Sequence, residues 1–175
     1  MSASALSPLP SNVTATELRN IGLFGALPEK VLHYLCSSLH VDEVGPGSYL
    51  FREGELGNFM YVVLQGDVEV LKKSKTGADA RVALLGPGDW FGEMSIIDVQ
   101  PRSASILTVS PARLLKVTAA DLDRLYRFDV KSYCLIVLNI AREMSRRLRV
   151  ADGILADLIA NVVQDYAASK TKPPA

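Results

Sequence analysis

Short apolar runs separated by turn residues fill the middle of the chain, and the pattern changes from helical to strand-like near Val41. Glycine, proline and aspartate bound these runs, which is typical of strands joined by tight turns. The pattern predicts strands near His40–Val44, Ser48–Phe51, Met60–Gln65, Val68–Lys72, Arg81–Leu85, Asp89–Phe91, Ser103–Thr108 and Ala112–Thr118. Strands at this spacing indicate a mainly β fold, a sandwich or a jelly-roll barrel.

Helical patterns flank the strands on both sides. Thr14–Glu17 is typical of a helix start with an acidic residue in its first turn, and Pro28 opens a second helix. We expect these two helices to form an N-terminal lid on the barrel. After the strands, residues 119–128 predict a short helix with Leu122 and Leu125 facing inward.

A much longer helix follows, with Asp129 as its cap and an end near Tyr166. Its apolar residues recur at alternating steps of four and three: Val137, Ala141, Met144, Leu148, Ala151, Leu155, Leu158 and Val162. This spacing makes a seam that a partner helix can fill, so we expect a parallel homodimer. The alternative, a helix lying on its own barrel, we expect only for the first two turns.

The chain has 175 residues, of which 49% are hydrophobic, enough for one domain with a real core and an appended helical segment. The predicted organisation is a flexible tail at 1–13, a main domain at 14–128, the dimerisation helix at 129–168 and a second flexible tail at 169–175.

The charge is balanced, with 19 Lys and Arg residues against 19 Asp and Glu residues. This balance argues against non-specific binding to nucleic acid or to a membrane surface, and it favours a small, specific anion as ligand. The start of the chain does not have the pattern of a secretory signal, and the apolar stretch at 133–141 is too short to cross a bilayer. We therefore expect a soluble, cytoplasmic protein.

Few residues offer catalytic or metal-binding chemistry. The two histidines, His33 and His40, lie before or at the first strand and are not clustered with other ligands. Cys36 and Cys134 lie far apart in helical patterns, and we expect both to be buried fillers. No residue lies in a recognisable nucleophile motif, so the sequence predicts neither an enzyme nor a metal or other cofactor.

The strongest chemical signal lies in one segment, Phe91–Ile106. Gly92 lets the backbone approach a ligand closely, and residues 93–98 can form one helical turn whose N–H groups face an anion. A proline then stiffens the return, and Arg102 places a planar cation opposite those amides. The segment predicts a site for a phosphate and a ribose. The alternative is that Glu93 and Arg102 form a solvated surface pair.

The same segment resembles, without a gap, the phosphate-binding cassette of the cyclic nucleotide-binding domain family, which begins Phe-Gly-Glu and ends Pro-Arg-x-Ala. The resemblance implies that Glu93 holds the ribose 2′-hydroxyl and that Arg102 holds the cyclic phosphate. It also places Ser103 next to both phosphate and base. The other pocket residues that it implies are Phe91, Gly92, Met94, Ser95 and Ala104.

The long helix carries a second resemblance. Residues 144–152, Met-Ser-Arg-Arg-Leu-Arg-Val-Ala-Asp, are similar to the dimer helix of the catabolite activator branch of the family. By this likeness Arg147 reaches towards Glu93. The chain departs from that branch at Ala151 and Asp152, which stand in place of a Thr-Ser pair, and a carboxylate suits the N–H donors of adenine or of guanine. We expect cyclic AMP, with cyclic GMP as the alternative.

These observations predict a stand-alone, non-catalytic receptor for a cyclic mononucleotide that signals through a dimer to an unidentified protein effector. We expect no direct binding to nucleic acid or membrane, because the chain ends soon after the long helix and leaves no room for a helix-turn-helix. The start and the polar tail favour a complete protein. The alternatives are a receptor for cyclic GMP or a cyclic dinucleotide, and a regulatory fragment of a transcription factor or other larger effector.

Overall fold

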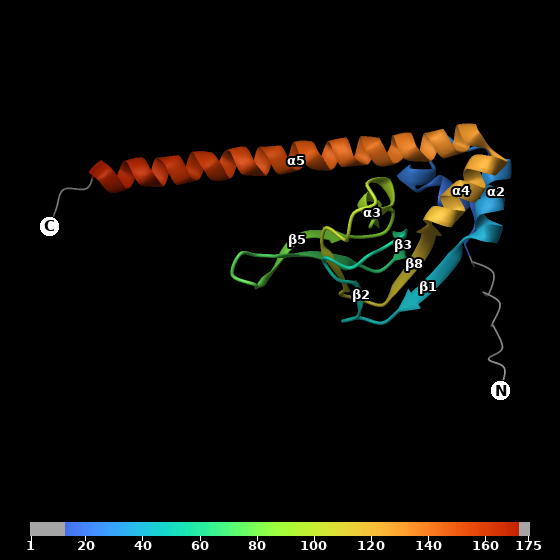
Figure 1. The fold of residues 1–175 in the computed structure, drawn as a ribbon, viewed down its shortest axis with the longest axis horizontal. Helices are drawn as coiled ribbons and strands as arrows, with labels where there is room; N and C mark the ends of the chain where they lie inside the picture. Colours follow the sequence, from blue (N-terminus) through green and yellow to red (C-terminus); the bar gives the residue numbers. More distant parts are fainter. Residues whose placement is uncertain (1–12, 172–175) are drawn as a thin grey trace. The chain divides into compact units, whose positions relative to one another are not determined.

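The computed structural model describes residues 13–171, and the chain divides into two compact units between Val137 and Leu138. The first unit holds two four-stranded antiparallel sheets (Figure 1). Their strands are β1 (His40–Val44), β2 (Tyr49–Phe51), β3 (Phe59–Gln65), β4 (Val68–Lys73), β5 (Asp79–Leu85), β6 (Trp90–Phe91), β7 (Ser105–Thr108) and β8 (Ala112–Thr118). Each overlaps a predicted strand, so the predicted strand pattern is confirmed.

The order of the strands identifies the fold. One sheet has the order β1-β8-β3-β6 and the other has the order β2-β7-β4-β5. Accordingly β1 pairs with β8, β2 with β7, β3 with β6 and β4 with β5. This nested pairing of first with last strands is a double-stranded β-helix, and the predicted jelly roll is confirmed.

Both sheets contribute to one apolar interior. Its buried residues are Phe51, Tyr61, Val63, Val68, Phe91, Ile106, Ala112 and Leu114. Residues 60–63 of β3 are all buried, so this strand is covered on both of its faces. The consequence for function is that aromatic side chains from β2, β3 and β6 meet inside the jelly roll.

Helical segments precede, interrupt and follow the strands of the first unit. They are α1 (Ala15–Arg19), the 3₁₀ turn η1 (Gly22–Phe24), α2 (Glu29–Ser38), α3 (Met94–Ile97) and α4 (Ala119–Phe128). Thr14 caps α1 through a reciprocal bond with Glu17, as the predicted helix start requires. α2 and α4 lie side by side (Figure 1), and Tyr34 stacks on Phe128 with 4.2 Å between ring centroids. Leu122 and Leu125 are buried as predicted.

The long predicted helix is α5 (Val130–Thr171). Asp129 precedes it and accepts a hydrogen bond from the backbone N–H of Ser132 at 2.9 Å, and this bond is the main cause that lowers the pKa of the Asp129 carboxyl. The helix extends to Thr171, beyond its predicted end near Tyr166. Ser, Lys and Thr continue a helix at modest cost, and the first proline comes only at Pro173.

Two further expectations need correction. Cys134 is exposed, and Cys36 is half-buried, so the cysteines are not both buried fillers. Cys134 lies two positions from Ser132 and from Ile136, which are buried, and a shift of two residues carries a side chain to the far side of a helix. Val13 is buried rather than part of a loose tail. The rest of the predicted tails, residues 1–12 and 172–175, lies outside the described residues.

Two properties of residues 13–171 bear on function. No helix there is long and apolar enough to span a bilayer. No group of three or more His, Cys, Asp or Glu side chains in this part of the chain is arranged to hold a metal ion.

Candidate functional site

The segment with the strongest chemical signal forms a strand, a tight turn and a short helix. β6 ends at Phe91, Gly92 has a φ of +83°, and α3 follows from Met94 to Ile97. The backbone N–H groups of residues 96 and 97 donate to the carbonyl of Glu93 at 3.0 and 3.1 Å. The predicted helical turn is confirmed, and its first amides have no acceptor within the helix, as at any helix start.

Arg102 is the central side chain of this site, and only 3% of it is exposed. Its guanidinium carbon lies 3.8 Å from the ring centroid of Phe51 and 4.5 Å from that of Phe59. Nη1 donates to the carbonyl of Gly92 at 2.9 Å and to Oγ of Ser95 at 2.8 Å. Aromatic rings and two neutral acceptors therefore hold the cation in place, since attraction to ring faces stabilises a desolvated guanidinium.

Two glycines leave the space that Arg102 occupies. A Cβ on Gly57 would lie 2.3 Å from Nε of Arg102, and a Cβ on Gly92 would lie 2.7 Å from its Nη1. Both distances are far below van der Waals contact. The guanidinium therefore lies directly against the backbone at both positions, and no larger residue fits there without moving it.

The remaining donors of Arg102 are unpaired. Nε and Nη2 are buried and have no hydrogen-bond partner among the residues that the structure describes. Burial lowers the pKa of Arg102, while Tyr61, Glu55 and Glu93 act in the opposite direction. A buried donor without an acceptor costs free energy, so this arrangement favours a ligand that brings acceptor oxygens.

The backbone of Arg102 is held as firmly as its side chain. Its N–H donates to the carbonyl of Glu55 at 2.8 Å, and its carbonyl accepts from the N–H of Gly54 at 2.9 Å. Both partners belong to the loop between β2 and β3. The loop that supplies Gly57 thus also fixes the main chain that carries the cation.

Other predicted residues lie on the same segment of the chain as Arg102. Glu93 and Ser95 are buried, and Ser95 also donates to the carbonyl of Gly92 at 3.1 Å. Ser103 is exposed, and its hydroxyl lies 3.5 Å from Sδ of Met94. Phe91 is buried, and Ala104 is half-buried. Because Glu93 and Arg102 are both buried, the alternative of a solvated surface pair is wrong.

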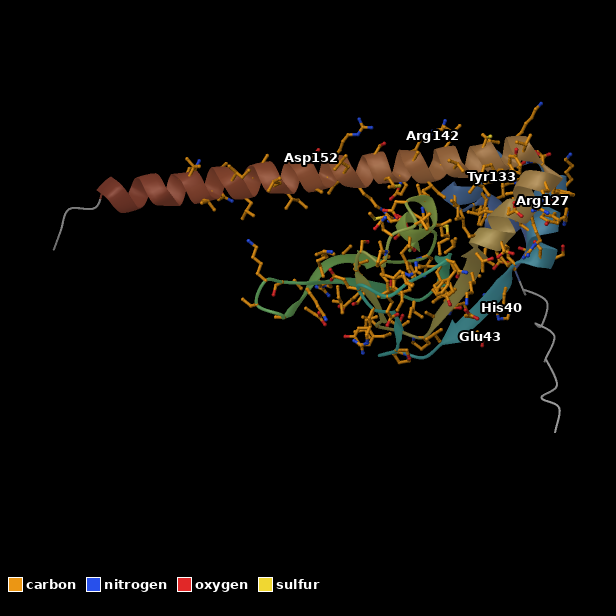
Figure 2. All side chains as sticks on the ribbon, viewed as in Figure 1. His40, Glu43, Arg127, Tyr133, Arg142 and Asp152 are labelled. Carbon is orange, nitrogen blue, oxygen red and sulfur yellow. The ribbon has the colours of Figure 1, made fainter. Side chains whose placement is uncertain are left out.

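Arg147 and Asp152 belong to the second unit. Nε of Arg147 donates to Oε1 of Glu143 at 2.8 Å, and Arg146 pairs with the same carboxylate. Asp152 and Arg142 project from α5 (Figure 2). The predicted reach of Arg147 towards Glu93, and the role of Asp152 at a base, remain predictions.

Three contributors to the site were not predicted: Phe51, Phe59 and Gly57. Phe51 ends the predicted strand Ser48–Phe51, and that prediction does not place its ring beside a cation. Phe59 precedes the predicted third strand by one residue. Their shared role depends on the pairing of distant strands, for which the chain carries no local signal.

A jelly roll that buries a partly unpaired guanidinium beside the start of a short helix defines a class of domain suited to a small phosphate-bearing ligand. A family model described as the cyclic nucleotide-binding domain matches residues 41–129. Because the match covers half of the chain, the chain belongs to the cyclic nucleotide-binding domain family.

Individual relatives agree with this assignment. The chain is 36% identical over 131 residues to the cyclic AMP receptor protein of Thermus thermophilus. The aligned residues make up 73% of this chain and 57% of the relative. It is 31% identical over 142 residues to a CRP-like cAMP-activated global transcriptional regulator of Mycobacterium tuberculosis, with coverages of 81% and 62%. The chain therefore spans about three fifths of the length of these curated relatives.

A solved structure agrees as well. The crystal structure of a cyclic nucleotide-binding domain from Methylobacillus flagellatus is similar with a TM-score of 0.73 and 28% identity, over 82% of this chain and 81% of the other.

Proposed function

We propose that this chain is a non-catalytic receptor for a cyclic mononucleotide, and that cyclic AMP is its ligand. The observation that carries the proposal is the pair of buried, unpaired donors on Arg102. A cyclic phosphate has one negative charge and exocyclic oxygens that accept such donors. The relative that is 36% identical is named a cyclic AMP receptor protein, which favours cyclic AMP over cyclic GMP.

Each residue of the site has a role in this proposal. Arg102 and the first amides of α3 bind the phosphate, and Glu93 accepts a hydrogen bond from the ribose 2′-hydroxyl. Ser103 contacts the phosphate and the base. The residues that complete the pocket are Phe91, Gly92, Met94, Ser95 and Ala104, with Arg147 and Asp152 from the long helix.

Titration calorimetry tests the ligand directly. We expect the pure protein to bind cyclic AMP more tightly than cyclic GMP, and a cyclic dinucleotide least. A clear preference for cyclic GMP would support the alternative that the Asp152 carboxylate pairs with guanine. If none of the three nucleotides binds, the proposed function is wrong.

We further propose that the ligand acts on a homodimer formed through α5, and that the dimer signals to a protein effector. The apolar side chains of the second unit support this, since a single helix offers them no packing partner within that unit. Among them, Leu148, Leu155, Leu158 and Val162 are exposed by 54–61%. Together with Ala151 they recur at steps of three and four, which makes a continuous seam for a second copy.

Ligand binding must favour one arrangement of the protein for any signal to result. We expect cyclic AMP to slow amide hydrogen exchange in residues 130–160, because the nucleotide would draw α5 towards the cassette and order the dimer. Mass spectrometry of exchanged peptides, with and without ligand, measures the effect. Identical exchange in both samples would contradict the signalling proposal while leaving ligand binding intact.

A second function is favoured by one finding, the partial coverage of the relatives. One of them is named a global transcriptional regulator, and the chain spans 62% of it. The chain would then be the regulatory part of a larger effector. A gel-shift assay with bulk DNA tests direct DNA binding by this chain: we expect no retardation with or without nucleotide, and retardation would favour a transcriptional regulator over a receptor that signals to a protein effector.

A further inference from the structure

Lys72, near the end of β4, connects two segments that are far apart in the sequence. Its Nζ donates to Oε1 of Glu53 at 2.8 Å and to the carbonyl oxygen of Ser103 at 2.5 Å. Glu53 lies in the loop after β2, and Ser103 directly follows Arg102. A lysine outside the predicted pocket therefore holds the backbone of a residue inside it.

The place where these contacts occur is a gap in the sheet. β4 and β7 pair as far as Leu71 and Ser105, and the ladder stops there. Beyond it, Oε2 of Glu53 accepts from the N–H of Lys73 at 3.0 Å, and the N–H of Glu53 donates to Oγ of Ser105 at 2.9 Å. Glu53 and the lysine side chain thus supply, across the gap, the hydrogen bonds that a regular ladder would supply.

These bonds fix the backbone on both sides of Ser103. The carbonyl of Arg102 accepts from the N–H of Gly54, and the carbonyl of Ser103 accepts from Lys72. Each of these carbonyls belongs to a planar peptide unit, so holding the oxygen also fixes the direction of the N–H in that unit. The second bond ends on an ammonium group and is therefore charge-assisted.

We propose that Lys72 is a positioning residue for nucleotide binding, which acts by setting the orientation of Ser103 relative to Arg102. This inference rests on the proposed function. The proposed action of Lys72 is through Ser103, since Nζ donates to the Ser103 carbonyl and to Glu53. Its side chain is 50% exposed and that of Glu53 is 24% exposed, so the pair should contribute little to global stability.

The chain offers a matched control in the next residue. The side chain of Lys73 is also exposed. Lys73 contacts Glu53 through its backbone N–H and not through its side chain. Lys72→Met and Lys73→Met therefore remove the same charge from adjacent positions on opposite faces of the strand. Lys72→Arg keeps a cationic donor that can reach two acceptors.

Calorimetric titration with cyclic AMP tests the inference. We expect Lys72→Met to bind about tenfold more weakly than the wild type, with Lys73→Met unchanged and Lys72→Arg within about threefold of the wild type. The melting temperature of Lys72→Met should stay within about 2 °C of the wild type. The backbone amide signals of residues 103 and 104 should shift in the free Lys72→Met protein and not in Lys73→Met.

A second measurement distinguishes positioning from a general loss of structure. The two phosphorothioate diastereomers of cyclic AMP differ only in which exocyclic oxygen is replaced by sulfur. If Lys72 sets the direction of donors at the phosphate, Lys72→Met should change the ratio of their affinities by about threefold or more. A change of less than this, with both affinities lowered equally, would overturn the inference.

The failure of this inference can be separated from failure of the proposed function. If the wild type binds cyclic AMP and Lys72→Met binds it equally well, Lys72 has no positioning role and the receptor function stands. If both lysine variants weaken binding equally, the cause is net charge and the inference is again wrong. If the wild type binds no cyclic nucleotide, both proposals fall.

Discussion

An Arg102→Leu variant will fold as well as the wild type but will bind cyclic AMP from tenfold to more than a hundredfold more weakly. Hydrogen bonds to a charged group are worth about 1.5–3 kcal/mol, and the guanidinium offers two unpaired donors to the ligand. Leucine keeps apolar contact with Phe51 and Phe59 while it removes a buried charge. Replacing a buried charge by an apolar residue is often neutral or stabilising, so we expect the melting temperature of the free protein not to fall.

The matched control for this variant is Arg52→Leu. Arg52 also lies over an aromatic ring, 3.6 Å from the centroid of Tyr49, but it is exposed. We expect it to bind cyclic AMP like the wild type. Calorimetry and thermal melts on the three proteins make the comparison, and equal affinity of Arg102→Leu and wild type would remove Arg102 from the site.

A Gly57→Ala variant is expected to lose cyclic AMP affinity to a similar degree, although it adds only one methyl group. The new Cβ would lie 2.3 Å from Nε of Arg102, so the guanidinium must leave its position beside Phe51 and Phe59. Overpacking of this kind costs about 1–3 kcal/mol, so this variant, unlike Arg102→Leu, should also melt at a lower temperature.

Gly45→Ala provides the control, because a Cβ on Gly45 meets no atom within 4 Å. Neither Gly57 nor Gly45 has a positive φ, so alanine introduces no backbone strain at either position. Side-by-side titration and melting of the two variants separates the steric effect on the cation from the general effect of replacing glycine. Normal binding by Gly57→Ala would show that the guanidinium need not occupy its present position.

The strands and the core of the site were predictable because their signals are local. Turn glycines and prolines bound the strands, and the cassette from Phe91 to Arg102 is one contiguous segment. β7 is the instructive difference, since it begins at Ser105 rather than at the predicted Ser103. The backbone of residues 102 and 103 bonds to the loop after β2 and to Lys72 instead of continuing the strand ladder. The alternation of apolar and polar side chains does not show where a ladder ends.

The unpredicted parts all depend on strand register. Phe51 and Phe59 lie on different sheets, and only the closed jelly roll brings both rings to Arg102. The sequence around Gly57 is typical of a turn, but the absence of a side chain at this position matters because Arg102, 45 positions away, lies against its backbone. Lys72 reads as an exposed strand residue, and its two acceptors come from segments that no short-range pattern links to it.

The aromatic walls around Arg102 have a consequence for anyone who engineers this fold. Phe51 belongs to the apolar interior, and the face of its ring also contacts the Arg102 guanidinium. If the proposed function holds, substitutions of Phe51 that raise thermal stability would weaken binding of the cyclic nucleotide. Selection for thermal stability and selection for ligand affinity would therefore act on the same ring. A more thermostable variant would need its stabilising substitutions at other positions.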